Sequence, residues 1–224
     1  MPKTYLYRVA DSHFYDRDAF IFAIDHYVPQ SNGKDEFSKR QVHFYNYGNE
    51  DEFEYFMENL IKLFRIRFQQ DQHSYDYVTL YPTHEAGGLN KNMQELIQGV
   101  SAATNIKYKQ ILQRNQTISP SHELETVEER KENVDGSVDV TEDVAGDSII
   151  VVDNVSISGI SLTDVTNLLY EKGAESVVCA CLGLSEVGKE GDYDDLNHTM
   201  GAQRIMEIFQ SPFIPEEERQ SHET

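Results

Sequence analysis

One segment of the chain, IIVVDNVSISGISLTDVTNLLYEKGA at residues 149–174, constrains the fold more than any other. It opens with a continuous apolar run, which is typical of a strand that is buried on both faces of a parallel sheet. Small and β-branched residues follow, and apolar residues at helical spacing then predict a helix from Ser161 to about Lys172, ended by Gly173. A buried strand that leads through a short loop into a helix is the repeating unit of an α/β fold.

From residue 50 onward, the chain continues this alternation of strands and helices. Apolar periodicity predicts helices at 50–67 and 93–105, and the small-residue loop THEAGGLN precedes the second helix. Strands are predicted for three runs of high β-propensity, at 75–82, 106–114 and 176–184. Residues 115–147 are polar and predict a long loop with one helical turn. We therefore expect an α/β fold with a mostly parallel sheet flanked by helices.

The two ends of the chain differ from this middle part in composition. The first 49 residues hold the aromatic-rich runs TYLYRV, AFIFAIDHYV and QVHFYNYG, which predict an antiparallel β hairpin or a small sheet. After Leu184 the chain becomes acidic and polar, and the tail PEEERQSHET is typical of a solvated, disordered end. The expected organisation is an amino-terminal β region over 1–49, an α/β domain over 50–184 and an acidic extension over 185–224.

The charge balance limits the partners of the chain, which has 39 acidic against 19 basic side chains and a formal net charge of −20. Nucleic acid and anionic membranes need clustered Lys and Arg, so neither is expected as the main partner. The acidic balance also fits a high-salt cytoplasm. No apolar stretch approaches the roughly 20 residues that span a bilayer, and the start MPKTYLYRV lacks the order of a signal peptide. Cys179 and Cys181 are expected in the core, and the location is expected to be cytoplasmic and reducing.

The segment that constrains the fold also carries the chemistry. Its strand ends at Asp153, at the edge where open α/β sheets place their ligands. Gly159 and the hydroxyls of Ser156, Ser158 and Ser161 lie around the start of the helix, where N–H groups are unpaired and the helix dipole is positive. Amides, hydroxyls and a helix N-terminus together predict a phosphate-binding site. The alternative interpretation is an ordinary strand–helix junction whose serines cap the helix.

At these residues the chain resembles the type I phosphoribosyltransferases. Their phosphate loop has four apolar residues, two acidic residues and a small-residue stretch ending in Thr-Gly-x-Thr/Ser, and IVVDNVSISGISL supplies that pattern here. Within the superfamily the chain is most similar to the competence protein F (ComF) type, through YPTHEAGGLNKNMQEL, LQRNQT and ERKENVDGSVDV. The resemblance covers roughly residues 76–184 and implies a type I phosphoribosyltransferase-like fold. The aromatic runs of the first 49 residues are expected to serve core and hairpin packing, and the alternative is a hood over the acceptor.

The resemblance implies roles for individual residues toward the donor, phosphoribosyl pyrophosphate. Asp153 and Asn154 would bind the ribose. Asp153 would interact with Mg²⁺ only indirectly, through the bound ligand. The residues that would surround the 5′-phosphate are Ser156, Ser158, Gly159, Ile160 and Ser161. The residues that would approach the pyrophosphate and its Mg²⁺ are Thr83, His84, Gly87 and Gly88.

Three basic residues are the candidate cations for the departing pyrophosphate. Arg114, Arg130 and Lys131 lie before or within the long loop, which is expected to fold over the site. The catalytic residues implied are Asp153, Arg114 and Lys131. For the three cations the alternative is solvated charge, and for His84 it is a surface turn.

Departures from the family pattern leave three classes of function open. Asn154 stands at the usual second acidic position, and serines and Ile157 replace the usual threonines. The zinc-binding cysteines of the ComF type are absent, as is the glutamine that follows its Arg-x-x-Thr stretch. The hypotheses are transfer of phosphoribosyl to a nitrogenous base, non-catalytic binding of phosphoribosyl pyrophosphate or a nucleotide, and an interaction protein that lost the ligand. A homodimer is the default expectation for the superfamily.

Overall fold

The computed structural model describes residues 6–10, 14–28, 35–68 and 75–185 of the chain. A six-stranded sheet in the order β1-β2-β8-β7-β3-β4 lies at its centre. Its strands are β1 (Leu6–Ala10), β2 (Ala19–Tyr27), β3 (Tyr77–Leu80), β4 (Lys107–Tyr108), β7 (Ser148–Ser156) and β8 (Ser176–Ser185). The strands from β2 to β4 in this order run parallel, and β1 pairs antiparallel with β2. The predicted fold class, a mostly parallel sheet with an amino-terminal antiparallel pair, is confirmed.

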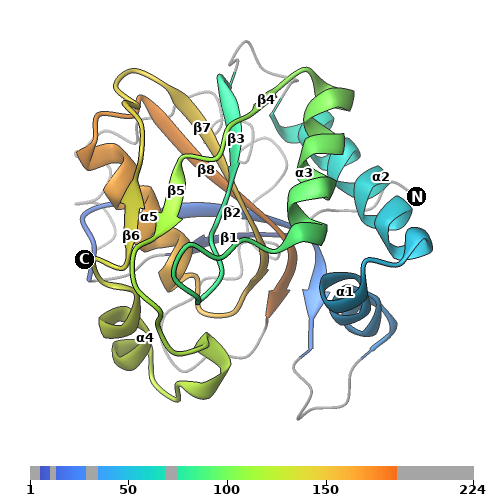
Figure 1. Cartoon of the computed structure of the whole chain (residues 1–224), viewed down its shortest axis with the longest axis horizontal. Helices are drawn as coiled ribbons and strands as arrows, with labels where there is room; N and C mark the ends of the chain where they lie inside the picture. The colour runs from blue at the N-terminus through green and yellow to red at the C-terminus, as the bar shows by residue number, and fades with distance from the viewer. Residues whose placement is uncertain (1–5, 11–13, 29–34, 69–74, 186–224) are drawn as a thin grey trace, which may run out of the picture.

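Helices cover both faces of this sheet. The helices are α1 (Glu36–Tyr47), α2 (Glu50–Arg67), α3 (Lys91–Thr104) and α5 (Ile160–Glu171). Figure 1 shows α1, α2 and α3 on one side of the sheet and α5 on the other. The predicted helices at 50–67, 93–105 and 161–172 correspond closely to α2, α3 and α5. The two faces hold separate hydrophobic clusters, because each strand sends alternate side chains to opposite sides.

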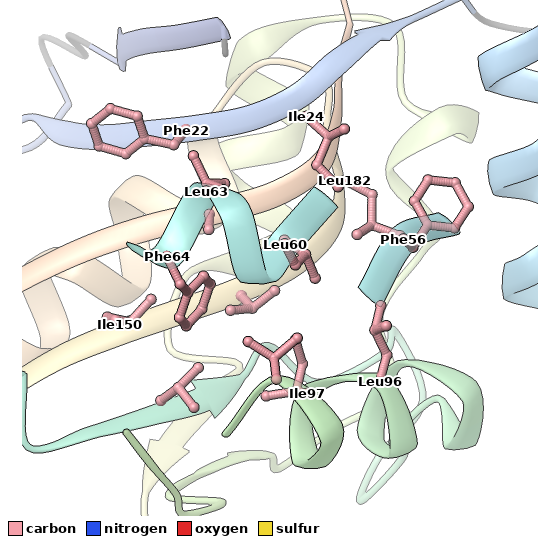
Figure 2. Packing of buried hydrophobic residues seen from close by; sticks show 14 of the residues in the cluster. Phe22, Ile24, Phe56, Leu60, Leu63, Phe64, Leu96, Ile97, Ile150 and Leu182 are labelled. Atoms are coloured by element: carbon pink, nitrogen blue, oxygen red, sulfur yellow. The ribbon is translucent and has the colours of Figure 1, made fainter. Parts of the chain in front are cut away.

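Strand β7 has both of its faces buried, as its continuous apolar sequence predicts. Ile150 and Val152 join the cluster under α1, α2 and α3, while Ile149 and Val151 join the cluster under α5. In Figure 2 Ile150 lies on the sheet near Phe64 of α2. Strand β8 is buried along its whole length. Its Cys179 and Cys181 are fully buried among the side chains on the α5 face, which confirms the expectation that both belong to the core.

The prediction of strand for the aromatic run at 41–48 is wrong, because residues 41–47 belong to α1 and Gly48 caps it. Phe37, Gln41 and Phe44 are buried at helical spacing, and the side chain of Asp35 caps the helix by accepting from Ser38 N–H at 2.7 Å. Gly48 ends the helix in the left-handed region, at φ 66°. Tertiary packing of this apolar stripe overrides the β-propensity of its aromatic residues.

Two further predictions are wrong between α3 and β7. The strand expected at 106–114 is divided between β4 and β5 (Leu112–Arg114), which belong to different sheets. The long loop expected at 115–147 contains a 3₁₀ turn (Ser121–Glu123), α4 (Val127–Val134) and β6 (Val138–Val140). Strand β6 pairs antiparallel with β5. A capping box at Thr126 and Glu129 begins α4, so this polar segment is ordered by local hydrogen bonds more than by apolar burial.

The expected division at residues 49 and 184 stays a prediction, although β2 lies in the same sheet as β8. The acidic extension lies outside the described residues beyond Ser185. Among the helices that the structure describes, none combines the length and apolar character needed to span a membrane.

Candidate functional site

A cleft of about 510 Å³ opens at the carboxyl-terminal edge of the parallel strands. It is lined by the end of β2 at Tyr27, the residues after β3 up to His84, and the chain from Asp153 to Gly159. Ligands in open α/β sheets bind at this edge. The cleft contains the predicted site residues Thr83, His84, Arg114, Asp153, Asn154, Ser156, Ser158, Gly159 and Ser161. Four others, Gly87, Gly88, Ile160 and Lys131, do not line it.

Helix α5 begins at the cleft without a side-chain cap. Gly159 precedes it at φ 84°, a left-handed conformation that glycine adopts without strain, and among the described residues the helix has no side-chain cap hydrogen bond. The first intrahelical contact runs from Thr163 N–H to the Gly159 carbonyl at 2.9 Å. The N–H groups of Ile160, Ser161 and Leu162 therefore lack intrahelical acceptors, and Ser161 and Leu162 line the cleft. This end of α5 can donate to an anion.

Two buried serines lie beside that helix start. Ser156 is 4% exposed and Ser158 is 5% exposed, and both line the cleft. The Ser156 Oγ is buried and has no hydrogen-bond partner among the described residues. Since a buried hydroxyl normally has a hydrogen-bond partner, the unsatisfied Ser156 Oγ marks this part of the cleft lining as a candidate binding position.

The acidic residue of the cleft is Asp153, at the point where β7 reaches it. Burial raises the pKa of Asp153 to about 7, against the opposing effects of the Asn154 N–H and the Arg114 guanidinium. The Asn154 N–H donates to Asp153 Oδ1 at 2.7 Å, and the Val155 N–H donates to Asn154 Oδ1 at 2.7 Å. Gln41 Nε2 of α1 donates to the Asn154 carbonyl at 2.6 Å, so the amino-terminal region holds this part of the site in place.

Arg114 lies at the cleft, but its guanidinium is occupied by protein groups. It is 2% exposed and donates through Nε to the Thr83 carbonyl and through Nη2 to the Tyr81 hydroxyl, both at 3.0 Å. Its Nη1 donates to Ser137 Oγ. Arg114 thus joins β5 to the loop after β3 and brings one positive charge near Asp153.

The loop at residues 83–88 presents side chains to the cleft and turns its glycine amides away. Gly88 N–H donates to Glu85 O at 2.9 Å, and Gly87 N–H donates to Arg114 O at 2.8 Å. A Cβ on Gly88 would lie 2.2 Å from Thr83 Oγ1, so this position requires glycine for packing. Thr83 and His84 are the two residues of this loop that line the cleft.

Arg130 and Lys131 lie on α4, outside the cleft lining. Arg130 donates to the backbone carbonyls of Ser121 and Leu124, and Lys131 pairs with Asp135 at 3.0 Å. The segment from Ile118 to Ser121 does border the cleft. Two hydrogen bonds between Asn133 and the Ser119 backbone, together with Arg130, hold this segment against α4.

Aromatic residues of the first 49 residues also reach the cleft. Tyr27 ends β2 and Tyr45 lies on α1, and both line the cleft opposite α5. Burial, followed by the charge of Asp153, raises the pKa of Tyr45 to about 12. The aromatic runs predict packing or a hood in general, and neither expectation distinguishes these two tyrosines from the other aromatic residues. No local motif marks them, because the chain brings them to the cleft through the docking of α1 and β2.

Among the residues that the structure describes, no three His, Cys, Asp or Glu side chains are grouped so as to hold a metal ion. The described lining residues include three ionisable side chains other than tyrosine, those of Asp153, Arg114 and His84.

Comparison with known proteins gives likenesses in structure alone. No family model matches the chain, and no curated protein matches it. Hypoxanthine phosphoribosyltransferase from Trypanosoma cruzi matches at 11% identity and a TM-score of 0.43, over 64% of this chain and 73% of that one. Adenine phosphoribosyltransferase from Leishmania tarentolae matches at 10% identity and a TM-score of 0.39, over 75% of this chain and 91% of that one.

A longer protein is also similar to part of this chain. The allosteric regulatory enzyme of purine biosynthesis matches at 15% identity and a TM-score of 0.41, over 76% of this chain. The match spans 37% of the length of that enzyme.

Proposed function

We propose that the cleft binds phosphoribosyl pyrophosphate with Mg²⁺ and that the protein transfers the phosphoribosyl group to a nitrogenous base. One observation carries the proposal: the buried, unpartnered Ser156 hydroxyl lies beside the uncapped start of α5. Both features are hydrogen-bonding groups without partners among the described residues, and both suit a phosphate. The resemblance of the sequence to the ComF-type phosphoribosyltransferases remains a prediction that agrees with this proposal.

In this proposal the ligand extends along β7 and its loop. The 5′-phosphate accepts from the α5 amides and from the hydroxyls of Ser156, Ser158 and Ser161. The ribose hydroxyls donate to the Asp153 carboxylate, which lies three residues before the end of β7 at Ser156. The pyrophosphate lies toward Thr83 and His84, whose loop Arg114 holds in position.

The cleft suits a Mg²⁺ ion that arrives with its ligand. Mg²⁺ in proteins is usually held by one or two carboxylates together with substrate phosphates. Asp153 is the one carboxylate among the described lining residues, and one of its oxygens already accepts from Asn154 N–H. We therefore treat Mg²⁺ as part of the substrate. It neutralises the negative charge of the ligand's phosphates, for which the described lining residues supply few basic side chains.

In the proposed transfer, the bond from the anomeric carbon to the pyrophosphate oxygen breaks and pyrophosphate leaves with the electron pair. A ring nitrogen of the base forms the new bond to that carbon and releases its proton to solvent. Asp153 stabilises the positive charge that develops on the ribose, and Arg114 contributes positive charge near the leaving group without being free to close on it.

Binding without turnover is the second candidate, and specific contacts favour it. The guanidinium of Arg114 is occupied by Thr83, Tyr81 and Ser137, and the glycine amides of the 83–88 loop are occupied by protein carbonyls. Asn154 supplies no second negative charge, and its side-chain oxygen accepts from Val155 N–H. These contacts reduce the groups available to the pyrophosphate while leaving the phosphate end of the cleft complete.

Calorimetry with phosphoribosyl pyrophosphate and Mg²⁺ tests the shared part of the two candidates, using Ser156→Ala against Ser176→Ala. Both serines have buried hydroxyls without a partner among the described residues, but Ser176 lies at the opposite end of the sheet. We expect Ser156→Ala to weaken binding roughly tenfold and Ser176→Ala to leave it unchanged. Absence of heat at millimolar ligand in the unmodified protein would sink both candidates and leave the interaction protein.

Pyrophosphate release separates the two candidates from each other. The protein is incubated with the donor, Mg²⁺ and each of a panel of nucleobases. Release that depends on one base supports transfer. Clear donor binding with no release for any base supports binding without turnover.

A further inference from the structure

The cleft has a second end that differs in chemistry from the α5 end. Tyr27 and Tyr45 line it, together with Asn90 and Met93 at the start of α3. These residues come from β2, α1 and α3, and the helices among them cover the face of the sheet opposite α5. A ligand whose phosphate lies at α5 therefore extends past Asp153 toward two tyrosine rings and a methionine.

This end is lined by two aromatic side chains and a thioether, and among the described lining residues it has no free lysine or arginine. Arg114 is the single lysine or arginine among the described lining residues, and its guanidinium is occupied on three sides by protein groups. The Asn90 amide is engaged through both atoms, since Oδ1 accepts from Met93 N–H at 3.0 Å and Nδ2 donates to Tyr45 O at 3.1 Å. The tyrosine hydroxyls can donate neutral hydrogen bonds, which do not offset the desolvation of an anion.

The surroundings also oppose negative charge directly. The charge of Asp153 acts on Tyr45 and, after burial, contributes to the raised pKa of that phenol. Burial likewise raises the pKa of Tyr27. Both phenols are neutral at pH 7, and a carboxylate placed between them and Asp153 would be repelled by the ionised form of Asp153.

We propose that this second end binds the uncharged planar ring of a nitrogenous base and excludes rings that carry a carboxylate. The inference rests on the proposed function and specifies its acceptor class. Tyr45 and Tyr27 are the specificity-determining residues: their rings provide stacking surface, and the absence of a free cation beside them among the described residues rejects an anionic ring.

Two nucleotides that differ by one carboxylate test the proposal. Uridine 5′-monophosphate and orotidine 5′-monophosphate share the ribose 5′-phosphate and the pyrimidine ring, and only the second carries a ring carboxylate. Calorimetry measures both, with inosine 5′-monophosphate as an uncharged purine and ribose 5-phosphate as the ligand without a ring. We expect at least one of the two nucleotides with an uncharged ring to bind more tightly than ribose 5-phosphate. We expect orotidine 5′-monophosphate to bind at least tenfold more weakly than uridine 5′-monophosphate.

Matched variants assign the effect to the tyrosines. Tyr45→Leu should lower the affinity for the tighter-binding of uridine and inosine 5′-monophosphate roughly five- to tenfold. The affinity for ribose 5-phosphate should stay unchanged. Tyr47→Leu is the control, because Tyr47 lies on the same helix and is 71% exposed. Tyr27→Arg places a cation at this end of the cleft and should raise the affinity for orotidine 5′-monophosphate relative to uridine 5′-monophosphate.

The outcomes separate this inference from the proposed function. Equal or tighter binding of orotidine 5′-monophosphate overturns the inference while the phosphate site stands. The inference is also overturned if no nucleotide binds more tightly than ribose 5-phosphate, because the ring then adds no affinity. Failure of ribose 5-phosphate, phosphoribosyl pyrophosphate and every nucleotide to bind overturns the proposed function, and the inference with it.

Discussion

Helices α4 and α5 pack against each other but begin in opposite ways. At α4, Thr126 Oγ1 accepts from Glu129 N–H and Glu129 Oε2 accepts from Thr126 N–H, both at 3.1 Å, and two glutamates occupy the first turn. At α5 a glycine precedes the helix, no side chain caps it, and the first turn holds no acidic residue. The start of α4 satisfies its own donors, whereas the start of α5 leaves them open.

The two helix starts differ because the two helices have different roles. The capped helix α4 carries Arg130 and Asn133, which hold the segment bordering the cleft. The uncapped helix α5 opens onto the cleft beside the unpartnered Ser156 hydroxyl. A helix that stabilises its neighbours can complete its own hydrogen bonds, while a helix that binds an anion must leave donors for it.

The largest expected effect concerns Asp153, the acidic residue next to the open helix start. Asp153→Asn should weaken the binding of phosphoribosyl pyrophosphate on the order of 100-fold, because it removes charge-assisted hydrogen bonds from the ribose hydroxyls. Calorimetry in Mg²⁺ measures the effect. Asp143→Asn is the matched control, since Asp143 is exposed and lies outside the cleft. Equal affinity in the two variants would mean that Asp153 does not contact the ligand.

The same substitution should change the pH dependence of stability. Burial raises the pKa of Asp153 to about 7, so the folded protein holds this proton more tightly than the unfolded chain. The folded state therefore loses stability through this group as the pH rises from about 4 to about 7, and the difference levels off above pH 7. Relative to Asp153→Asn, the unmodified protein without ligand should lose roughly 3–4 kcal/mol of unfolding free energy over that interval.

Denaturant unfolding of both proteins at several pH values measures this difference. Other titrating groups, including Asp164 with its pKa raised by burial to about 6, are present in both proteins and cancel. A difference that does not vary with pH would show that Asp153 has an ordinary pKa.

A pair of glycines sharpens the comparison of the two helices. Gly159 precedes α5 at φ 84°, and Gly136 follows α4 at φ 61° with open space around its Cβ position. Either substitution by alanine should cost about 1 kcal/mol of stability, because both force an alanine into the left-handed region. Only Gly159→Ala should also weaken phosphate binding, by roughly tenfold. Similar loss of binding in both variants would point to a general effect of stability.

The smallest expected effect concerns the caps themselves. Thr126→Ala removes the capping box of α4 and should cost about 1 kcal/mol of unfolding free energy. Ser161→Ala lies in the first turn of α5, which has no side-chain cap, and should change stability by less than about 0.5 kcal/mol. Thermal or denaturant unfolding without ligand measures both. A larger loss of unfolding free energy for Ser161→Ala than for Thr126→Ala would show that the start of α5, and not that of α4, stabilises the fold.

Local sequence patterns predicted the elements whose packing follows from their own periodicity. The helices at 161–172 and 50–67 and the start of the strand at 149 match their predictions, because continuous or periodic apolar runs leave few alternatives. The end of that strand differs, since β7 continues past Asp153 to Ser156. The aromatic residues at 41–48 predict a strand, while the buried residues Phe37, Gln41 and Phe44 have the spacing of a helix. The capping box that begins α4 is present in the sequence, and the lack of apolar periodicity obscured it.

The candidate site was predicted in part for the same reason. Asp153, Ser156, Ser158 and Ser161 belong to one contiguous motif, and the structure brings them together at one edge of the sheet. The basic residues illustrate the limit of this approach. A sequence shows that Arg114 carries charge, but the partners that bury it are Thr83, Tyr81 and Ser137, which lie far from it along the chain.

The sequence by itself determined an α/β architecture and the identity of the loop at the end of β7, since both depend on residues close together along the chain. Only the tertiary structure decided that Tyr27 and Tyr45 line the cleft, that Arg114 is a buried link, and that the Ser156 hydroxyl has no protein partner among the described residues. Burial, hydrogen-bond satisfaction and raised pKa values arise when distant segments pack together, so no local pattern contains them.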